Sequence, residues 1–123
     1  MMKDSIYMTD RDREKILQSC KDCKEDKIII THGTDTMVDT AKLLGIKIKN
    51  KTIVLTGALY PEIVRESDAV FNLGGAIAGV QALGKGVYII IDGRVFTWNN
   101  VRKNKRKGIF EKLNKNISWQ HLI

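Results

Sequence analysis

Three short apolar runs recur along the chain, and polar residues bound each of them. They cover residues 27–31, 52–56 and 87–91 and are rich in isoleucine and valine. Nearly continuous β-branched runs of this length, without polar alternation, are typical of strands that are buried on both faces in a parallel sheet. The pattern therefore predicts three buried strands.

Helical periodicity precedes the first of these runs. Thr9 and Asp12 can cap the start of a helix, because a hydroxyl and a carboxylate at this spacing satisfy orphan backbone N–H groups. The helix is predicted to continue to about Lys24. Its apolar face is predicted to consist of Ile16, Leu17, Cys20 and Cys23.

Two further helices are predicted between the strands. The turn at residues 32–35 leads into a helix that ends near Leu44, with Gly45 as its C-terminal stop. The pair Ser67–Asp68 can cap another helix, which is predicted to continue to about Leu83. The apolar stripe of this last helix is predicted to be Val70, Leu73, Ile77 and Val80.

The pair Asp92-Gly93 after the third run predicts a tight hairpin turn, with residues 94–98 returning as a fourth strand. Strands that alternate with helices imply right-handed crossovers and an α/β fold. We expect three layers, αβα, around a mostly parallel sheet with this β-hairpin at its edge. The site is expected at the carboxyl ends of the strands. Residues 99–123 form a basic C-terminal segment without clear periodicity.

Composition agrees with one globular domain over residues 1–123. The chain is 43% hydrophobic and 28% charged and has a single proline, which argues against disorder. Its longest apolar run is far shorter than a membrane span, and its first residues lack the apolar core of a signal peptide. We therefore expect a cytoplasmic protein that has no membrane partner.

Positive charge is concentrated in the last quarter of the chain. Residues 94–123 hold eight of the 21 basic side chains and one of the 14 acidic ones, so the net charge of +7 resides there. Such a segment can bind nucleic acid or an acidic partner. A solvated surface is the commoner role of a charge run, so we expect no nucleic-acid partner.

The cysteines form a Cys-x-x-Cys pair, Cys20 and Cys23, which is a weak signal on its own. A zinc site needs two more ligands, and the only histidines are His32 and His121. A redox pair normally opens a helix after a strand, whereas this pair lies late in a predicted helix. We expect two partly buried thiols in a reducing compartment and no metal site.

The stretch Thr31-His32-Gly33-Thr34-Asp35-Thr36-Met37 holds the most informative side chains. It places a hydroxyl and a carboxylate on a glycine-containing turn between a buried strand and a helix. Backbone N–H groups at that helix start can stabilise developing negative charge. From spacing alone, the alternative is that Thr34 and Asp35 only cap the helix. His32 is expected to have a structural role.

This stretch, followed by Thr40-Ala41, resembles the second conserved box of the L-asparaginases. Three further blocks agree in order: residues 54–61, residues 67–73 and the stretch from Gly86 to Lys103. The resemblance covers residues 3–113 and is closest to the short, single-domain members. It implies an asparaginase N-terminal-type domain, which is Rossmann- or flavodoxin-like, and an amidohydrolase that converts L-asparagine to L-aspartate and ammonia without a metal or cofactor.

The resemblance also implies roles for particular residues. By motif match, Thr34, Asp35 and Lys103 would form the catalytic triad, because a threonine hydroxyl needs a nearby base to become reactive. Asp35 would orient the lysine or bind the substrate ammonium. The substrate would lie against Ser5, Gly33 and Ala58: Ser5 would hold its carboxylate, and backbone N–H groups around Thr34 and Ala58 would be the oxyanion donors.

One part of the family pattern has no counterpart in this sequence. The family's first catalytic threonine lies in a Thr-Gly-Gly-Thr-Ile box, and the sequence contains no such box. We therefore expect an incomplete domain that lacks the first βα element, and a triad that supplies half of the family's site. Loss of a central strand exposes sheet edges and apolar surface, so we expect a homo-oligomer.

These observations leave three functional hypotheses. The first is an asparaginase-like amidohydrolase, whose activity in this form is an open question. The second is a non-catalytic domain that binds an amino acid or acts as a partner subunit. The third is a nucleic-acid module that uses residues 103–107, with an amidotransferase subunit acting on charged tRNA as a variant between the first and the third.

Overall fold

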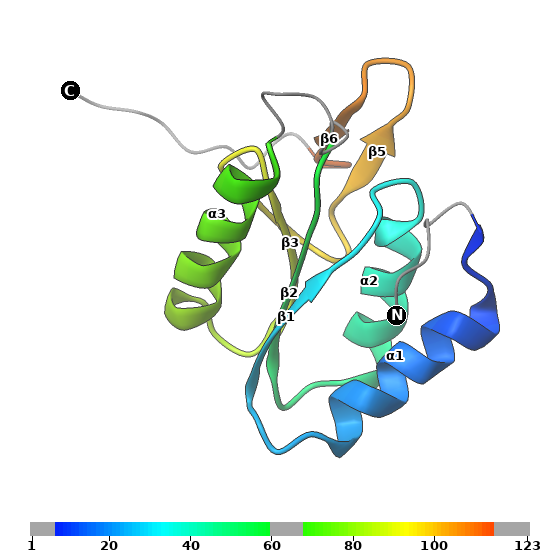
Figure 1. The fold of residues 1–123 in the computed structure, drawn as a ribbon, viewed down its shortest axis with the longest axis vertical. Helices are drawn as coiled ribbons and strands as arrows, with labels where there is room; N and C mark the ends of the chain where they lie inside the picture. Colours follow the sequence, from blue (N-terminus) through cyan, green and yellow to red (C-terminus); the bar gives the residue numbers. More distant parts are fainter. Residues whose placement is uncertain (1–6, 60–67, 115–123) are drawn as a thin grey trace.

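The computed structural model describes residues 7–59 and 68–114, and these residues form the expected three layers. A four-stranded sheet in the order β1-β2-β3-β4 lies in the middle. Helices α1 and α2 cover one face of the sheet and α3 covers the other (Figure 1). The elements are α1 (Asp10–Asp22), β1 (Lys27–Thr31), α2 (Met37–Lys47), β2 (Thr52–Thr56), α3 (Ala69–Ala82), β3 (Gly86–Ile91) and β4 (Arg94–Thr97).

The first three strands are parallel, and their register is regular. Lys27 pairs with Thr52 at the start of β1 and β2, and Thr52 pairs in turn with Gly86 of β3. Only β4 is antiparallel, and it follows the turn at Asp92-Gly93. Both turn residues have positive φ, 54° and 69°, as a tight hairpin turn requires. The α/β class, the parallel sheet and the edge hairpin are therefore confirmed.

Two apolar clusters hold the layers together. The larger cluster lies between the sheet and the α1–α2 layer and includes Leu44, Ile53 and Phe96, whereas Val54, Ala76 and Ile90 join the sheet to α3 on the opposite face. All five residues of β2 are buried because the strand lies between β1 and β3 and under both helical layers. Burial of this apolar area is the main stabilising term of the fold.

The first strand differs from the prediction of full burial. Residues 28–30 are only half-buried, and both ends of β1 are exposed. The reason is position, because no strand within residues 7–59 and 68–114 pairs with the side of β1 that faces away from β2. An apolar run predicts a buried strand, but it does not predict which other strands lie beside it in the sheet.

The predicted helix starts are partly confirmed. Thr9 and Asp12 form a reciprocal capping box: Asp12 N donates to Thr9 Oγ1 at 3.2 Å, and Thr9 N donates to Asp12 Oδ2 at 3.0 Å. Asp68 is the N-cap residue of α3, but its carboxylate binds Leu59 N and Asn72 Nδ2 instead of the helix start. Ser67 lies outside the described residues.

The predicted stop of α2 at Gly45 is wrong, because the helix continues to Lys47 and Gly45 lies inside it. The glycine serves packing at this position. A Cβ atom on residue 45 would lie 2.3 Å from the ring of Trp98, which follows β4. Since Trp98 packs on the larger core cluster, this helix can approach the sheet only with a glycine there.

The predicted apolar stripe of α3 is also largely wrong. Val80 is buried as expected, but Val70 is 83% exposed, Leu73 41% and Ile77 47%. The residues that α3 buries are Asn72, Ala76 and Val80. Gly75 and Gly79 face Ile90 of β3, so the helix lies close to the sheet through its small residues while its large ones face outward.

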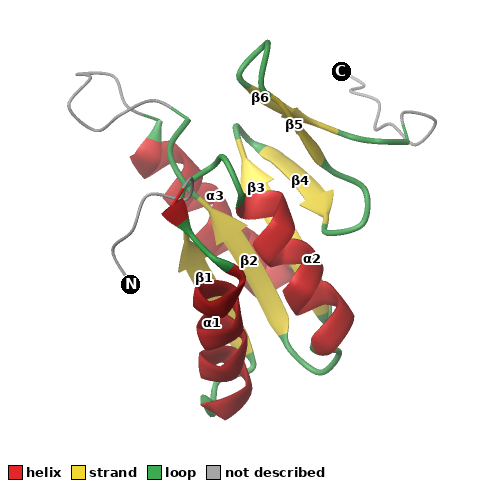
Figure 2. Cartoon of the chain, turned by 90° about the vertical axis from the view of Figure 1, so that its right-hand side faces the viewer, coloured by secondary structure: helices red, strands yellow, loops and turns green. Residues whose placement is uncertain are grey.

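The basic segment contains a hairpin that the sequence pattern did not predict. Strand β5 (Arg102–Asn104) pairs with β6 (Ile109–Glu111) in a separate antiparallel sheet. Phe110 of β6 is buried, and its ring centroid lies 6.5 Å from that of Phe96. Figure 2 shows this hairpin beyond the end of the main sheet, beside β4 and near the start of α2.

Replacement of Gly45 by alanine is expected to destabilise the protein. The new methyl group would overlap the Trp98 ring and force the helix or the ring to move, at a cost of about 1–3 kcal/mol. Gly74→Ala is the matched control, since no atom lies within 4 Å of a Cβ there. Alanine in place of glycine at an open helix position raises the free energy of unfolding by about 0.5–1 kcal/mol. Urea unfolding measures both changes, and equal effects of the two substitutions would contradict the packing argument.

Candidate active site

The turns after β1 and β2 lie side by side at the carboxyl edge of the sheet. His32 N donates to Thr56 O at 2.9 Å, which extends the pairing of β1 and β2 into the turns. Gly57 lies directly against the His32 carbonyl, because a Cβ there would be 2.2 Å from that oxygen. The close approach of the two backbones therefore requires glycine at position 57. Ala58 follows it and is half-buried at this edge.

The β5–β6 hairpin brings a lysine to the first of these turns. Lys103 Nζ donates to Thr34 Oγ1 at 2.8 Å and to Asp35 Oδ1 at 2.9 Å. Thr34 is 9% exposed, and the side chains of Lys103 and Asp35 are 14% and 42% exposed. Three predicted site residues therefore meet, although Lys103 lies far from the other two in the chain.

The contacts of Thr34 and Asp35 argue against a role limited to helix capping. The N-cap residue of α2 is Thr36, so Thr34 and Asp35 precede the cap and extend to Lys103. A threonine hydroxyl beside an amine, next to a helix start, is an arrangement suited to nucleophile activation. A carboxylate on the far side of the amine holds it in place.

The buried side chain of His32 links the turn after β1 to α2 through two hydrogen bonds. Its Nδ1 lies 2.6 Å from Gly33 O, which can only accept, so Nδ1 carries the proton and donates it. Its Nε2 lies 2.8 Å from Thr40 Oγ1 and accepts from that hydroxyl. Burial lowers the pKa of His32 below its ordinary value of 6.5. These contacts agree with the expected structural role.

Asn72 is a residue whose importance the sequence pattern did not reveal. It is 1% exposed, and Nδ2 donates to Gly57 O at 2.8 Å and to Asp68 Oδ2 at 2.7 Å. Its Oδ1 accepts from Asp92 N at 2.8 Å. One side chain thus joins the loop after β2, the start of α3 and the β3–β4 turn. A polar residue on the sheet-facing side of an apolar helix was the available signal.

Two of the other predicted substrate-binding residues, Gly33 and Ala58, lie in the turns after β1 and β2. Gly33 lies in the turn between His32 and Thr34, and its carbonyl accepts the His32 proton. Ala58 lies between Gly57 and Leu59, and the backbone of Leu59 is held by Asp68. Ser5 lies outside the described residues.

Two arginines of the positively charged last quarter of the chain bind other residues of the fold. Arg102 pairs with Glu111 across the hairpin, and Arg94 Nη1 donates to Phe110 O at 3.1 Å. Residues 105–107 form the exposed turn of the hairpin.

Within the described ranges, no group of three or more His, Cys, Asp or Glu side chains could hold a metal ion. Cys20 and Cys23 are free thiols, the first buried and the second half-buried.

Two pockets differ in their relation to this site. A pocket of about 140 Å³ lies at the carboxyl edge, between Leu59, Asp92 of the β3–β4 turn and Phe110 of β6. A larger pocket of about 370 Å³ lies away from the site, between α1 and β1. The larger pocket contains neither Thr34 nor Lys103, so the chemistry is assigned by the side-chain contacts and not by cavity size.

Comparison with known proteins identifies the family. The family model described as Asparaginase, N-terminal matches residues 1–115. L-asparaginase 2 of Escherichia coli is 34% identical over 106 residues, which are 83% of this chain and 29% of that protein. The chain belongs to the asparaginase family, which confirms the resemblance of its sequence motifs. It spans less than a third of the Escherichia coli protein's length.

Solved structures agree with this assignment. The thermostable L-asparaginase from Thermococcus kodakarensis superposes with a TM-score of 0.85 and 28% identity, over 93% of this chain and 37% of that one. A probable cytoplasmic L-asparaginase from Campylobacter jejuni gives a TM-score of 0.70 and 34% identity, over 82% and 33% of the two chains. Over the described part of this chain, no helix is long and apolar enough to cross a membrane.

The depressed pKa of His32 predicts a pH dependence of stability. A histidine that stays neutral when folded but protonates when unfolded stabilises the fold above pH 6.5, and this stability is lost as pH falls below that value. The slope from one such group cannot exceed about 1.4 kcal/mol per pH unit. Urea unfolding of the wild type and of His32→Asn, at pH 7.5 and at a series of lower pH values, measures how the free energy of unfolding of each protein changes with pH. A wild type that loses no more stability than the variant would contradict the prediction.

Replacement of Asn72 by leucine is expected to destabilise the fold by about 2–4 kcal/mol. The apolar side chain fills the space but leaves Gly57 O and Asp92 N without their buried partner. Gln81→Leu serves as the control, because Gln81 is exposed on the same helix and its side chain donates to the backbone of that helix, at Ile77 O. If urea unfolding shows that the Asn72 variant loses less than about 1 kcal/mol of unfolding free energy, the prediction is wrong, because water then replaces Asn72 at Gly57 O and Asp92 N.

Proposed function

We propose that this chain hydrolyses the side-chain amide of L-asparagine to L-aspartate and ammonia at Thr34, Asp35 and Lys103. The observation that carries the proposal is the contact of Lys103 Nζ with Thr34 Oγ1 at 2.8 Å and with Asp35 Oδ1 at 2.9 Å. Family membership supports the reaction class, since the relatives reported above are named as L-asparaginases.

In the proposed reaction Thr34 Oγ1 attacks the amide carbon, and its proton passes to Lys103 Nζ, which must be uncharged for this step. Backbone N–H groups around Thr34 and Ala58 stabilise the negative charge that develops on the carbonyl oxygen. The C–N bond then breaks, and Lys103 returns the proton to the nitrogen, which leaves as ammonia. Water then attacks the carbonyl carbon of the aspartyl ester and gives a proton to Lys103 Nζ, the C–O bond to Thr34 breaks, and the proton returns to Thr34 Oγ1. Every proton transfer uses side chains of this chain, without a cofactor.

Charge favours an amino acid as the substrate. Asp35 is bound to Lys103 through Oδ1 and is 42% exposed, so its outer surface can receive the substrate ammonium. Gly33 provides backbone without a side chain beside the reacting hydroxyl, and Ser5 is proposed to bind the substrate carboxylate. We further propose a cytoplasmic location, as the name of the Campylobacter jejuni neighbour says of that protein.

Loss of either reacting group is expected to slow ammonia release strongly. Thr34→Ala removes the nucleophile and Lys103→Met removes the proton acceptor, and each is predicted to lower kcat/KM by roughly 10²-fold or more. Lys105→Met is the matched control, because Lys105 is an exposed lysine on the turn of the same hairpin. A coupled assay of ammonia from L-asparagine measures all four proteins. Equal loss in the Lys105 variant would contradict the assigned roles.

The second candidate is a non-catalytic amino-acid-binding domain. It is favoured by the Asp35 carboxylate, which is 42% exposed beside Lys103 and can bind the ammonium group of an amino acid whether or not hydrolysis follows. Calorimetry with L-aspartate and L-asparagine separates the candidates. Heat of binding that Thr34→Ala reduces, without ammonia release from the folded wild type, would support the binding domain and contradict the hydrolase.

A further inference from the structure

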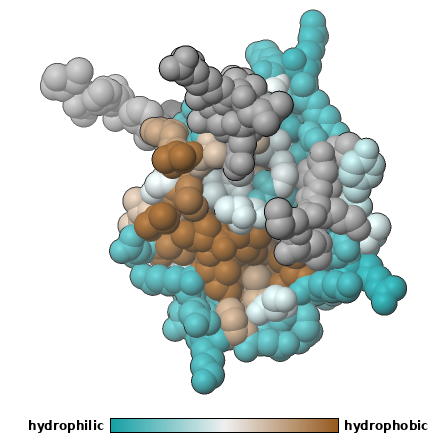
Figure 3. Space-filling model, in the orientation of Figure 1, coloured by the Kyte–Doolittle hydropathy of each residue, from teal (hydrophilic) through white to brown (hydrophobic). Residues whose placement is uncertain are grey.

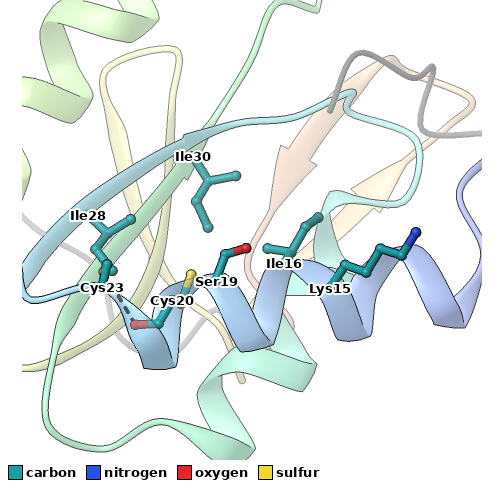
Figure 4. Close-up of a pocket in the computed structure, with 7 residues that line it drawn as sticks. All are labelled: Lys15, Ile16, Ser19, Cys20, Cys23, Ile28 and Ile30. Carbon is teal, nitrogen blue, oxygen red and sulfur yellow. Dashed lines mark hydrogen bonds between the residues drawn. The ribbon is translucent and has the colours of Figure 1, made fainter.

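Polar side chains, rather than the apolar clusters, hold the two turns of the candidate site. Residues 33–34 and 57–58 belong to neither apolar cluster. Figure 3 shows hydrophobic residues gathered over the middle of one face, with paler residues above them. The larger pocket is lined by residues between Lys15 and Ile30, as Figure 4 shows, and by none from the two turns. The hydrogen bonds of buried polar side chains therefore set the conformation of these turns.

Asn72 fixes the orientation of the peptide group between Gly57 and Ala58. Its Nδ2 donates to Gly57 O at 2.8 Å, and the residue is only 1% exposed. The peptide bonds of the described residues are trans. In a planar trans peptide group the C=O and N–H bonds point in opposite directions. The N–H group of Ala58 therefore points away from Asn72 and from the interior of the domain.

His32 fixes the peptide group between Gly33 and Thr34 in the same way. Its Nδ1 donates to Gly33 O at 2.6 Å. The ring cannot turn freely, because its Nε2 is bound to Thr40 Oγ1 at 2.8 Å and the residue is buried. Since the Gly33 carbonyl is directed toward the ring, the N–H group of Thr34 is directed away from it.

The two N–H groups lie at the same edge of the sheet because their turns are in contact. Gly57 lies directly against His32 O, as the space for a Cβ shows. Neither Thr34 N nor Ala58 N donates to another of the described residues. Both carbonyls are bound on the inner side, so both N–H groups are directed to the outer side, where Thr34 Oγ1 meets Lys103.

We propose that His32 and Asn72 are positioning residues, which aim the N–H groups of Thr34 and Ala58 at the oxygen of the substrate amide. This inference rests on the proposed function, in which these N–H groups stabilise the developing negative charge. Donors that are fixed in advance need no reorganisation when that charge forms. A side chain that holds the carbonyl of the same peptide group therefore raises kcat without contacting the substrate.

Two amide variants of His32 separate positioning from a purely structural role. Asparagine places an N–H group where Nδ1 lies and keeps the donor to Gly33 O, whereas glutamine reaches the place of Nε2 and keeps only the contact with Thr40. In the ammonia assay, His32→Gln is predicted to lower kcat by roughly tenfold or more and His32→Asn by less than about threefold. KM is predicted to stay within about twofold of the wild type in both, because the N–H groups act mainly in the transition state.

Asn72→Ala tests the second peptide group. The substitution removes the hydrogen bond to Gly57 O, so kcat is predicted to fall by roughly tenfold or more while KM stays within about twofold. Gln81→Ala is the control on the same helix, because Gln81 is exposed and lies outside the network. Urea unfolding shows which variants are folded under the assay conditions. If Asn72→Ala does not fold, the two His32 variants decide alone.

The outcomes distinguish this inference from the proposed hydrolysis. A link that only ties the turn to α2 predicts the reverse order for His32, since glutamine keeps the contact with Thr40. Ammonia release by the wild type, with equal kcat in the two His32 variants or a larger loss in the asparagine variant, would overturn the positioning role and leave the hydrolysis standing. No release from the folded wild type would overturn both.

Discussion

Parallel pairing of β1, β2 and β3 is the constraint on which the rest of the structure depends. Because these strands share one direction, the turns that follow them meet at one edge of the sheet. The Gly33–Asp35 turn, the Gly57–Leu59 loop and the Asp92-Gly93 turn are brought together in this way. Lys103 then reaches the first turn from the β5–β6 hairpin, and Asn72 links the other two from α3.

This arrangement couples the candidate chemistry to the packing of the whole domain. Gly57 and its neighbours keep their conformation because His32, Asn72 and Asp68 hold the backbone on either side. The same helix that carries Asn72 lies close to β3 because Gly79 leaves room for Ile90, whose side chain would lie 2.2 Å from a Cβ at position 79. The large apolar residues Val70, Leu73 and Ile77 of α3 face outward instead.

Local signals in the sequence predicted most of the main sheet. Apolar runs marked β1, β2 and β3, the Thr9 capping box marked α1, and Asp92-Gly93 marked the hairpin, since each of these depends on a few adjacent residues. Features that depend on distant partners were missed. Gly45 lies inside α2 because Trp98 packs on it, and the basic segment forms a hairpin because Phe110 finds the core. The half-burial of β1 depends likewise on which strands lie beside it.

In the candidate site too, features set by adjacent residues could be predicted from the sequence, whereas features set by distant partners could not. Spacing alone could relate Thr34 to Asp35, but it favoured helix capping over a catalytic role. The link to Lys103 came from family resemblance, and the geometry now supplies its physical basis in two hydrogen bonds. Asn72 was missed because its role lies in joining loops that are separate in sequence. Ser5 stays a prediction.

A double-mutant cycle on ammonia release from L-asparagine tests the central claim most directly. It compares kcat/KM of the wild type, Thr34→Ala, Lys103→Met and the double variant. If Thr34 and Lys103 act as one unit, the double variant loses about as much as the more damaging single one. Losses that multiply would contradict the account, because the two residues would then act independently. Absence of release from the folded wild type would contradict it as well.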